Sequence, residues 1–401
     1  MRCGVLVLVD KPGMSEGIML KNLKVSNVFY NKKGLKRGKA EVKTANGTQT
    51  YGWGIRFIVQ SEKAVLKEVE VSNCIVSNVA HTGIKLTAKK NTLFHVNLYH
   101  NRVSKTGGPG IQMSGVRFGH IAHNSVSYSG SNDDSRKWGR GSGLWTWSAS
   151  DILIEKNRFA YANGPGDSAG CHIDFNCRNI IVQYNFSAHN AGGFCEILGN
   201  NYNCAYRYNI SVDDGFREKG VDGAFQEGKT LWLSGYNSGK RRGPFNSYIY
   251  NNTIYLSEKI TSRIAIDRVA DGILIANNIF FIKGKSRMVK GDQYKPETGG
   301  EWEVEHVVFK TNLFLTTDSW PAEMKLQDEQ PLYGNPDFIN AGGLNIEDYI
   351  PQNITLVKDK GMKISRLVND SLGLFIGLNP QADILGNPII GLPDLGAIEL
   401  R

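Results

Sequence analysis

The chain has 401 residues, of which 41% are hydrophobic and 21% charged, and its 47 Lys and Arg against 38 Asp and Glu give a net charge of +9. This composition supports a buried core and excludes a disordered chain. Apolar runs such as residues 5–9 are far shorter than the roughly 20 residues that cross a bilayer. No secretory apolar segment with a small-residue cleavage site follows Met1. We therefore expect no membrane-spanning protein, and the 45 Gly show no collagen-like period that would indicate a fibre.

Six cysteines are too few for a disulfide-dense scaffold of this length. None shows the CxxC spacing of a zinc site, so no metal site is predicted from them. Most of the six are expected to be buried thiols. One bridge, between Cys171 and Cys195, is an alternative if the two residues stack on neighbouring repeats.

One pattern recurs along the chain: a β-branched or aromatic alternation, then Asn, then another short apolar alternation. The shortest spacing between successive Asn is 23 to 24 residues. The repeats end near Asn73 and Asn78, then at Asn101, Asn124, Asn157, Asn185, Asn209, Asn252, Asn278 and Asn312.

A period of this length is typical of one coil of a β-solenoid, whose coils bury their apolar side only by stacking. Asn suits the turn because it tolerates the left-handed backbone region and because its amide can bond to the neighbouring coils. The alternative, an ordinary β-sandwich, seldom repeats one residue at one phase so often. We therefore predict an all-β fold, a right-handed parallel β-helix of roughly ten coils.

These repeats make the sequence resemble the pectate-lyase-like superfamily of bacterial, polysaccharide-degrading β-helix proteins. The segments 383–388 (DILGNP) and 393–399 (PDLGAIE) are similar to the closing segment of many such proteins. The resemblance implies the fold and a carbohydrate substrate but leaves the reaction open. We expect the coils to occupy residues 1–328, with inserts near 125–142 and 211–243. Residues 329–401 are expected to form a C-terminal wrap and cap of the same domain.

A second strand precedes the Asn strand in each coil and is usually introduced by Gly. Since successive side chains of a strand point to opposite faces, the second residue after the Gly faces outward. This outward column contains Arg56, Lys85, Gln112, Trp145, His172 and Glu196, and a neighbouring column contains Ile58, Thr87, Ser114, Trp147, Asp174 and Leu198.

Extending this alignment places Glu227 above Glu196 and Asp267 in a further coil. Because stacked strands lie about 4.8 Å apart, the acids and His172 are expected to share one patch beside the exposed Trp145 and Trp147. Solvated charges are common on a solenoid face, so each carboxylate alone has a structural interpretation; the convergence favours a functional one.

The first functional hypothesis is glycoside hydrolysis, which needs one protonated and one ionised carboxyl group. Asp174, Glu196 and Glu227 are the candidate catalytic acids, and His172 tunes protonation or binds substrate. A vertical pair such as Glu196 and Glu227 would suit retention, and a diagonal pair would suit inversion. The expected substrate-binding residues are Trp145, Trp147, Lys229, Arg263, Asp267 and Arg268.

The second hypothesis is a polysaccharide lyase. Elimination from a uronate needs a base, for which Lys229, His172 or Arg268 could serve, with Ca²⁺ neutralising the carboxylate. Asp213 and Asp214, or the acids of residues 132–134, are candidate Ca²⁺ ligands, although turns are the simpler interpretation. Hydrolysis requires no cofactor. A non-catalytic glycan-binding solenoid is the third hypothesis.

The net charge favours an anionic polysaccharide or oligosaccharide as the partner. No nucleic-acid-binding module is recognisable, so nucleic acid is not an expected partner. We expect a monomer that is secreted, periplasmic or on the cell surface, as the superfamily resemblance implies. The sugar, the linkage and the choice between exo and endo action are not encoded in any recognisable motif.

Overall fold

The computed structural model describes residues 3–29, 41–44, 47–50, 52–130, 140–237, 239–289 and 304–401. Side chains of residues 41–50 and of Glu305 are outside this description. The chain divides into two compact units. Unit 1 contains residues 1–172, 190–192 and 217–228, and unit 2 contains residues 173–189, 193–216 and 229–401.

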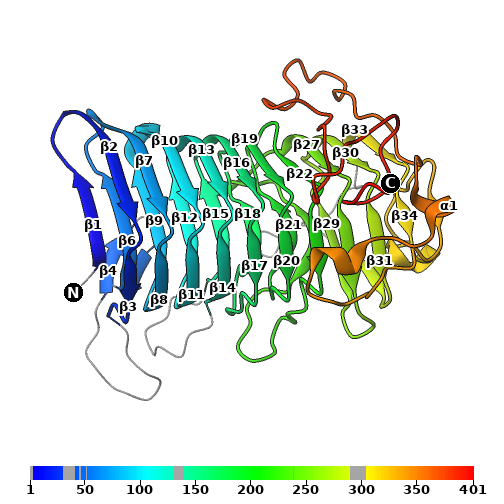
Figure 1. Cartoon of the computed structure of the whole chain (residues 1–401), viewed down its shortest axis with the longest axis horizontal. Coiled ribbons are helices and arrows are strands. Elements are labelled where there is room, and N and C mark those ends of the chain that lie inside the picture. The colour runs from blue at the N-terminus through cyan, green and yellow to red at the C-terminus, as the bar shows by residue number, and fades with distance from the viewer. Residues whose placement is uncertain are drawn as a thin grey trace. The chain divides into compact units, whose positions relative to one another are not determined.

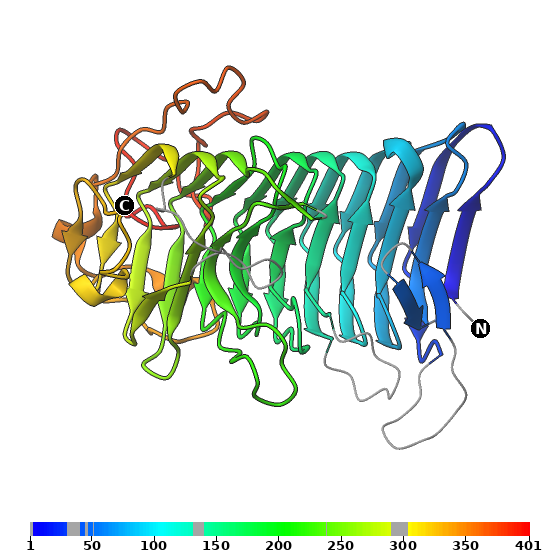
Figure 2. The same cartoon turned by 180° about the vertical axis from the view of Figure 1, so that it is seen from behind.

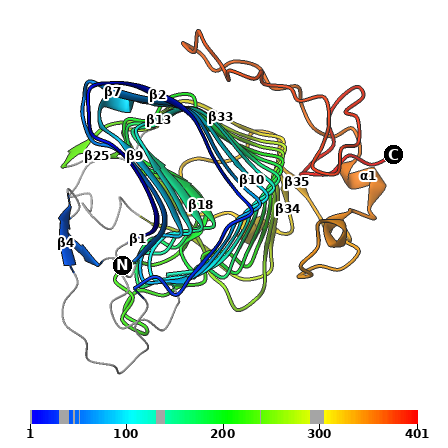
Figure 3. The ribbon, with the colours of Figure 1, turned by 60° about the vertical axis from the view of Figure 1, so that its left-hand side comes forward.

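The fold is a parallel β-helix whose strands form three parallel sheets of 10, 10 and 11 strands (Figure 1). The coils of each unit therefore have three strand-bearing sides (Figure 3). The all-β prediction is confirmed.

In unit 1 the strands of each sheet follow one another in chain order. The first sheet contains β1 (Cys3–Val9), β6 (Trp53–Val59), β9 (Ile84–Ala88), β12 (Ile111–Ser114) and β15 (Leu144–Trp147). The second contains β2 (Gly13–Lys21), β7 (Ala64–Ser72), β10 (Leu93–Tyr99), β13 (Val116–Ala122) and β16 (Ser150–Glu155). The third contains β3 (Lys24–Ser26), β8 (Ile75–Val79), β11 (Arg102–Thr106), β14 (Ser125–Ser129) and β17 (Arg158–Ala160). A hairpin, β4 (Glu41–Thr44) and β5 (Gly47–Thr50), and the 3₁₀ turn η1 (Lys89–Asn91) are additional.

Unit 2 has the same three-sided arrangement, and Figure 2 shows the molecule from the side opposite to that of Figure 1. Its first sheet contains β18 (Cys171–Ile173, which spans the unit boundary), β21 (Gly193–Ile197), β24 (Lys229–Leu233), β29 (Ser262–Ile266) and β32 (Ser286–Met288). The second contains β19 (Arg178–Gln183), β22 (Ala205–Arg207), β27 (Phe245–Tyr250), β30 (Asp271–Ala276) and β33 (Glu305–Lys310). The third contains β20 (Phe186–Ala188), β23 (Ile210–Val212), β28 (Thr253–Leu256), β31 (Ile279–Ile282), β34 (Leu313–Phe314) and β35 (Leu332–Tyr333). The remaining elements are the hairpin β25 (Tyr236–Asn237) and β26 (Lys240–Arg241), the turns η2 (Thr317–Ser319) and η3 (Ile346–Tyr349), and α1 (Ile354–Val357).

The glycines that introduce the first-sheet strands have a steric role. At Gly54, Gly83, Gly110 and Gly143 an added Cβ would lie 2.4–2.7 Å from the carbonyl oxygen of the corresponding glycine in the next coil. No Cβ fits at that distance, so the coils can approach this closely only where the side chain is hydrogen. The following residues, such as Ile55 and Ile84, are fully buried in the interior.

A ladder of buried asparagines lines the turn between the second and third sheets. In unit 2, the Nδ2 of Asn185 donates to the Oδ1 of Asn209 at 3.0 Å, and that of Asn209 donates to the Oδ1 of Asn252 at 3.0 Å. The ladder continues through Asn278 to Asn312, and the carboxylate of Asp328 accepts the last amide. Unit 1 contains the same ladder at Asn101, Asn124 and Asn157.

The ladder confirms the predicted bonding of Asn amides between neighbouring coils. The prediction that these asparagines themselves adopt the left-handed backbone region is wrong. The left-handed residues precede the ladder positions, as at Tyr208 (φ 52°) and Asn251 (φ 51°). Asn73, at φ 54°, is such a preceding residue, and Cys74 occupies the ladder position, where its backbone N–H donates to Asn101.

Residues 329–401 contain little regular structure and pack on the second- and third-sheet sides of unit 2. Tyr349, Val357, Leu395 and Ile398 join one core cluster with strand residues such as Ile210. All six cysteines are free thiols, so the alternative of a bridge between Cys171 and Cys195 is wrong.

Candidate active site on the first sheet

The first-sheet register in unit 1 agrees with the sequence alignment. Arg56 pairs with Lys85, Lys85 with Gln112, and Gln112 with Trp145. The neighbouring column, which ends with Ser114 opposite Trp147, is also in register. The expectation that both tryptophans are exposed is wrong for Trp145, which is only 5% exposed, whereas Trp147 is half-buried.

His172 is enclosed at the end of unit 1. Its ring stacks on the Trp145 ring with centroids 5.6 Å apart, and its Nδ1 lies 2.9 Å from the Oγ of Ser142. Burial lowers the pKa of His172 to about 4; Asp167 opposes this decrease and Arg140 adds to it. The imidazole is therefore neutral at neutral pH, which suits a hydrogen-bonding or base role better than that of a cation.

Beside His172, the guanidinium of Arg140 forms an ion pair with Asp167 at 2.6 Å and lies over the ring of Phe225, 5.0 Å from its centroid. The buried Arg217 donates to the carbonyl oxygens of Gly164 and Gln226. These contacts hold segment 217–228 of unit 1 in place, and the segment contains no strand.

The position of Glu227 is the main correction to the sequence alignment. Glu227 lies in segment 217–228, whereas the next strand of the first sheet after β21 is β24, which begins at Lys229. The strand partner of Glu196 is Trp232. Glu227 therefore does not stand above Glu196, and the proposed vertical pair of carboxylates is absent. Gly223 begins segment 223–227 and Gly228 precedes segment 229–233, and each glycine introduces short apolar residues, so the sequence pattern alone could not separate the two segments.

In unit 2 the outward column of the first sheet contains Glu196, Trp232 and Ala265. Glu196 is 6% exposed. The ammonium of the buried Lys229 lies 3.7 Å from the centroid of the Trp232 ring. This contact has cation–π geometry.

Asp174 and Asp267 belong to the neighbouring column of unit 2. Ile173 pairs with Ile197, so Asp174 is opposite Leu198, and Asp267 follows Ile266 in the same way two strands further on. The Oδ1 of the half-buried Asp174 accepts a hydrogen bond from the N–H of Phe175 at 2.8 Å.

The geometry of the strands estimates the separation of Asp174 and Glu196. They lie on one outer face, one strand and two residues apart. A strand spacing of about 4.8 Å and a rise of about 3.3 Å per residue give a Cβ separation of roughly 8 Å. The sequence alignment therefore brings these two predicted acids together in unit 2.

The other predicted binding residues of unit 2 have different surroundings. Asp267 is buried, forms an ion pair with Arg241 and accepts the N–H of Gly235 at 2.8 Å. The buried Arg263 donates to the carbonyl oxygen of Gly215, whereas Arg268 is exposed.

Sequence reasoning missed an aromatic pair beside Asp174. The rings of Phe175 and Tyr236 meet edge to face at 5.9 Å, and both residues are half-buried. Phe175 follows Asp174 directly, which was a signal in the sequence. Tyr236 and Arg241 are strand partners in the hairpin of β25 and β26, and only the fold brings that hairpin to this face.

Among the described residues, no group of three or more His, Cys, Asp or Glu side chains is placed to hold a metal ion. Asp213 accepts the N–H of Ser257, and Asp214 accepts the hydroxyl of Ser211. The candidate ligands at 132–134 lie outside the described residues. Within the described ranges, no helix has the length and apolarity to cross a membrane.

Comparison with known proteins supports the fold. The chain is 24% identical over 341 residues to lacto-N-biosidase of Bifidobacterium longum subsp. longum, an alignment that covers 76% of this chain and 19% of that protein. The chain thus spans about a fifth of the length of this curated relative.

Two solved structures are similar. XylC in complex with xylose matches with a TM-score of 0.50 at 12% identity, over 86% of this chain and 66% of that one. The GH136 lacto-N-biosidase of Eubacterium ramulus matches with a TM-score of 0.46 at 19% identity, over 76% and 45%. The model of the right handed beta helix region matches residues 53–254, half of the chain. Together with the three parallel sheets, this match shows that the chain belongs to the family of right-handed parallel β-helix proteins.

Proposed function

We propose that this protein hydrolyses glycosidic bonds of a polysaccharide or oligosaccharide, with Asp174 and Glu196 as the catalytic carboxyl groups. The observation that supports the proposal is the register of β18 and β21, in which Asp174 follows the strand residue paired with Ile197, the neighbour of Glu196. A Cβ separation of roughly 8 Å is compatible with carboxyl groups about 6.5 to 9.5 Å apart, the range of inverting glycosidases, in which a water molecule must fit between the sugar and the base.

The surroundings of the two acids suggest their roles. Glu196 is buried and is the strand partner of Trp232, whereas Asp174 is half-buried. Burial favours the neutral form of a carboxyl group. We therefore assign Glu196 as the acid that protonates the leaving oxygen and Asp174 as the base that activates water.

Contacts for the sugar are available beside Asp174. The ring pair of Phe175 and Tyr236 offers a half-buried apolar surface against which the C–H face of a pyranose can pack. The net charge of +9 favours acidic or sulfated glycans among the candidate substrates. The glycosidase name of the Bifidobacterium relative and the sugar bound to XylC are consistent with a carbohydrate substrate.

The competing reaction is β-elimination on a uronate. One observation favours it: the buried His172, with its lowered pKa, is neutral at neutral pH and could accept a proton. Elimination would leave an unsaturated uronate, which absorbs ultraviolet light, whereas hydrolysis creates no double bond.

The test is incubation of the protein with neutral, uronic and sulfated glycans, followed by reducing-end and ultraviolet assays on the same samples. New reducing ends without absorbance, with inverted anomers seen by NMR immediately after cleavage, are the expected result. Absorbance that rises in step with the reducing ends would establish a lyase. Binding without any new ends would leave the glycan-binding interpretation.

A further inference from the structure

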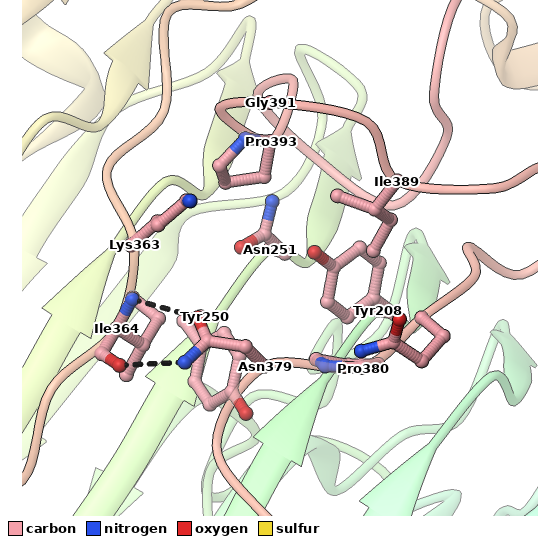
Figure 4. Close-up of a pocket in the computed structure, with 11 residues that line it drawn as sticks. Tyr208, Tyr250, Asn251, Lys363, Ile364, Asn379, Pro380, Ile389, Gly391 and Pro393 are labelled. Carbon is pink, nitrogen blue, oxygen red and sulfur yellow. Dashed lines mark hydrogen bonds between the residues drawn. The ribbon is translucent and has the colours of Figure 1, made fainter.

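Unit 2 contains a cavity that the proposed hydrolysis does not use. It lies on the second-sheet side, whereas Asp174 and Glu196 belong to the first sheet. Its volume is about 400 Å³, within the range of small-molecule sites. Tyr208, Tyr250 and Asn251 line it from the coils, and the C-terminal wrap contributes residues including Lys363, Asn379 and Ile389 (Figure 4).

The hydroxyl of Tyr208 points into this cavity (Figure 4). The side chain is only 2% exposed, and the residue lines the cavity. A ligand with a polar atom at that point would form a hydrogen bond with this hydroxyl. Burial raises the pKa of Tyr208 well above 10, so the hydroxyl keeps its proton and can donate.

The neighbouring hydroxyl is engaged elsewhere. The Tyr250 hydroxyl donates to the carbonyl oxygen of Leu378 and accepts a hydrogen bond from Arg207, so Tyr250 offers its ring to the cavity. Asn251 holds the wrap through bonds to Asp394 and Gly396. On the coil side of the cavity, the Tyr250 hydroxyl and the Asn251 amide are therefore already bonded. The Tyr208 hydroxyl is the group on this side that we expect to bond a ligand.

The wall opposite the coils combines polar and apolar groups. The amide of Asn379 bonds the backbone N–H and carbonyl of Ile364 at 3.0 and 2.9 Å, which fixes its plane and leaves one hydrogen and one lone pair for a ligand. Ile364, Ile389, Pro380 and Pro393 supply apolar surface. A compact molecule with hydroxyl groups around an apolar ring face matches this mixture.

The charges near the cavity favour a neutral ligand. Lys363 is the one cationic residue among those lining it, and its side chain is exposed. A site for a carboxylate or sulfate would instead present a buried guanidinium group. The nearby Arg207 guanidinium does not serve this purpose, because it already donates hydrogen bonds to Gln183, Tyr250 and Gly377.

We propose that this cavity is a second carbohydrate site, one that binds a neutral pyranose unit, with the Tyr208 hydroxyl as its buried hydrogen-bond donor. Such a site would hold a glycan chain on unit 2 independently of its cleavage. The proposal does not rest on Asp174 or Glu196.

Saturation-transfer NMR titrations with the methyl β-glycosides of glucose, galactose and N-acetylglucosamine test the proposal on the whole chain. We expect at least one of them to bind with Kd on the order of 1 mM. Tyr208→Phe removes only the hydroxyl and should weaken this binding about 5- to 10-fold. Ile389→Trp should fill the cavity and abolish the same binding.

Two controls separate this site from the others. Tyr333→Phe changes an exposed tyrosine outside the cavity and should leave binding unchanged. Asp174→Asn should also leave the Tyr208-dependent binding unchanged, whether or not it abolishes hydrolysis. Circular dichroism on each variant verifies folding.

Three results would overturn the proposal. The first is no binding of any neutral glycoside at about 20 mM, well above the expected Kd. The second is equal binding by the protein and a folded Tyr208→Phe variant. The third is methyl galacturonoside binding about tenfold more tightly than the galactoside with Lys363→Met removing the difference, which would make the cavity an anion site.

Discussion

The asparagine ladder and the outer face of the first sheet in unit 2 arise from the same repeat but differ in what they repeat. At the ladder position Asn185, Asn209 and Asn252 keep one residue type, and each amide is bonded to the next coil. On the outer face the column changes from Glu196 to Trp232 to Ala265. A position that keeps the same residue type in every coil meets a structural requirement. A position whose residue type changes from coil to coil can carry residues selected for binding or catalysis.

The largest effect that this comparison predicts is on catalysis. Glu196→Gln and Asp174→Asn should each lower kcat/KM about 10²- to 10⁴-fold, since each removes one proton-transfer group. The melting temperature should change little. Assays on the substrate identified by the glycan panel measure the loss, and Glu258→Gln, an exposed carboxyl on a turn, is the matched control. Full activity in both variants would show that neither Glu196 nor Asp174 is a catalytic residue.

Next in size is a loss of stability from the ladder. Asn209→Ala removes two ladder bonds and leaves the N–H groups of Asn185 without their acceptor. Because these donors are buried, we expect a cost of about 3 kcal/mol in the free energy of unfolding. Denaturant titration measures it, with Asn163→Ala, an exposed asparagine, expected to cost less than about 0.5 kcal/mol. Similar costs for both variants would contradict the ladder's role.

A third effect depends on pH and concerns the closing segment. Burial, with a contribution from Asp394, raises the pKa of Glu399 to about 8 from an ordinary value of 4.5. Between these values the folded chain keeps a proton that the unfolded chain has lost, so stability falls as the pH rises through this window.

Glu399→Gln keeps an acceptor for the N–H of Asp394 and removes the titration. It should stabilise the protein by roughly 2 kcal/mol at pH 8.5 and have almost no effect at pH 4.5. Thermal melts at the two pH values compare it with Glu347→Gln, an exposed control. A pH-independent difference would rule out the linkage.

The smallest effect is spectroscopic. Since burial lowers the pKa of His172 to about 4, its imidazole should stay neutral on acidification to pH 5. The unfolded chain binds a proton near pH 6.5, so the contribution of His172 to stability is present above pH 6.5 and decreases as the pH falls toward 4. Histidine NMR resonances, assigned with His172→Gln, should show this midpoint. A midpoint near 6.5 would place His172 in solvent.

The repeat by itself determined the β-helix, the positions of the ladder asparagines and most of the first-sheet register. Stacked coils share one period, and identical contacts between neighbours select identical residues at identical phase. The register that places Asp174 and Glu196 on one face is of this kind.

Only the tertiary structure decided the features that depart from the coil repeat. Segments 223–227 and 229–233 carry similar local patterns, and only the second pairs with β21, because the contacts of Arg217 and Arg140 hold the first in a loop. The burial of Trp145 and the approach of Tyr236 to Phe175 likewise depend on segments distant in sequence, so no local pattern could encode them.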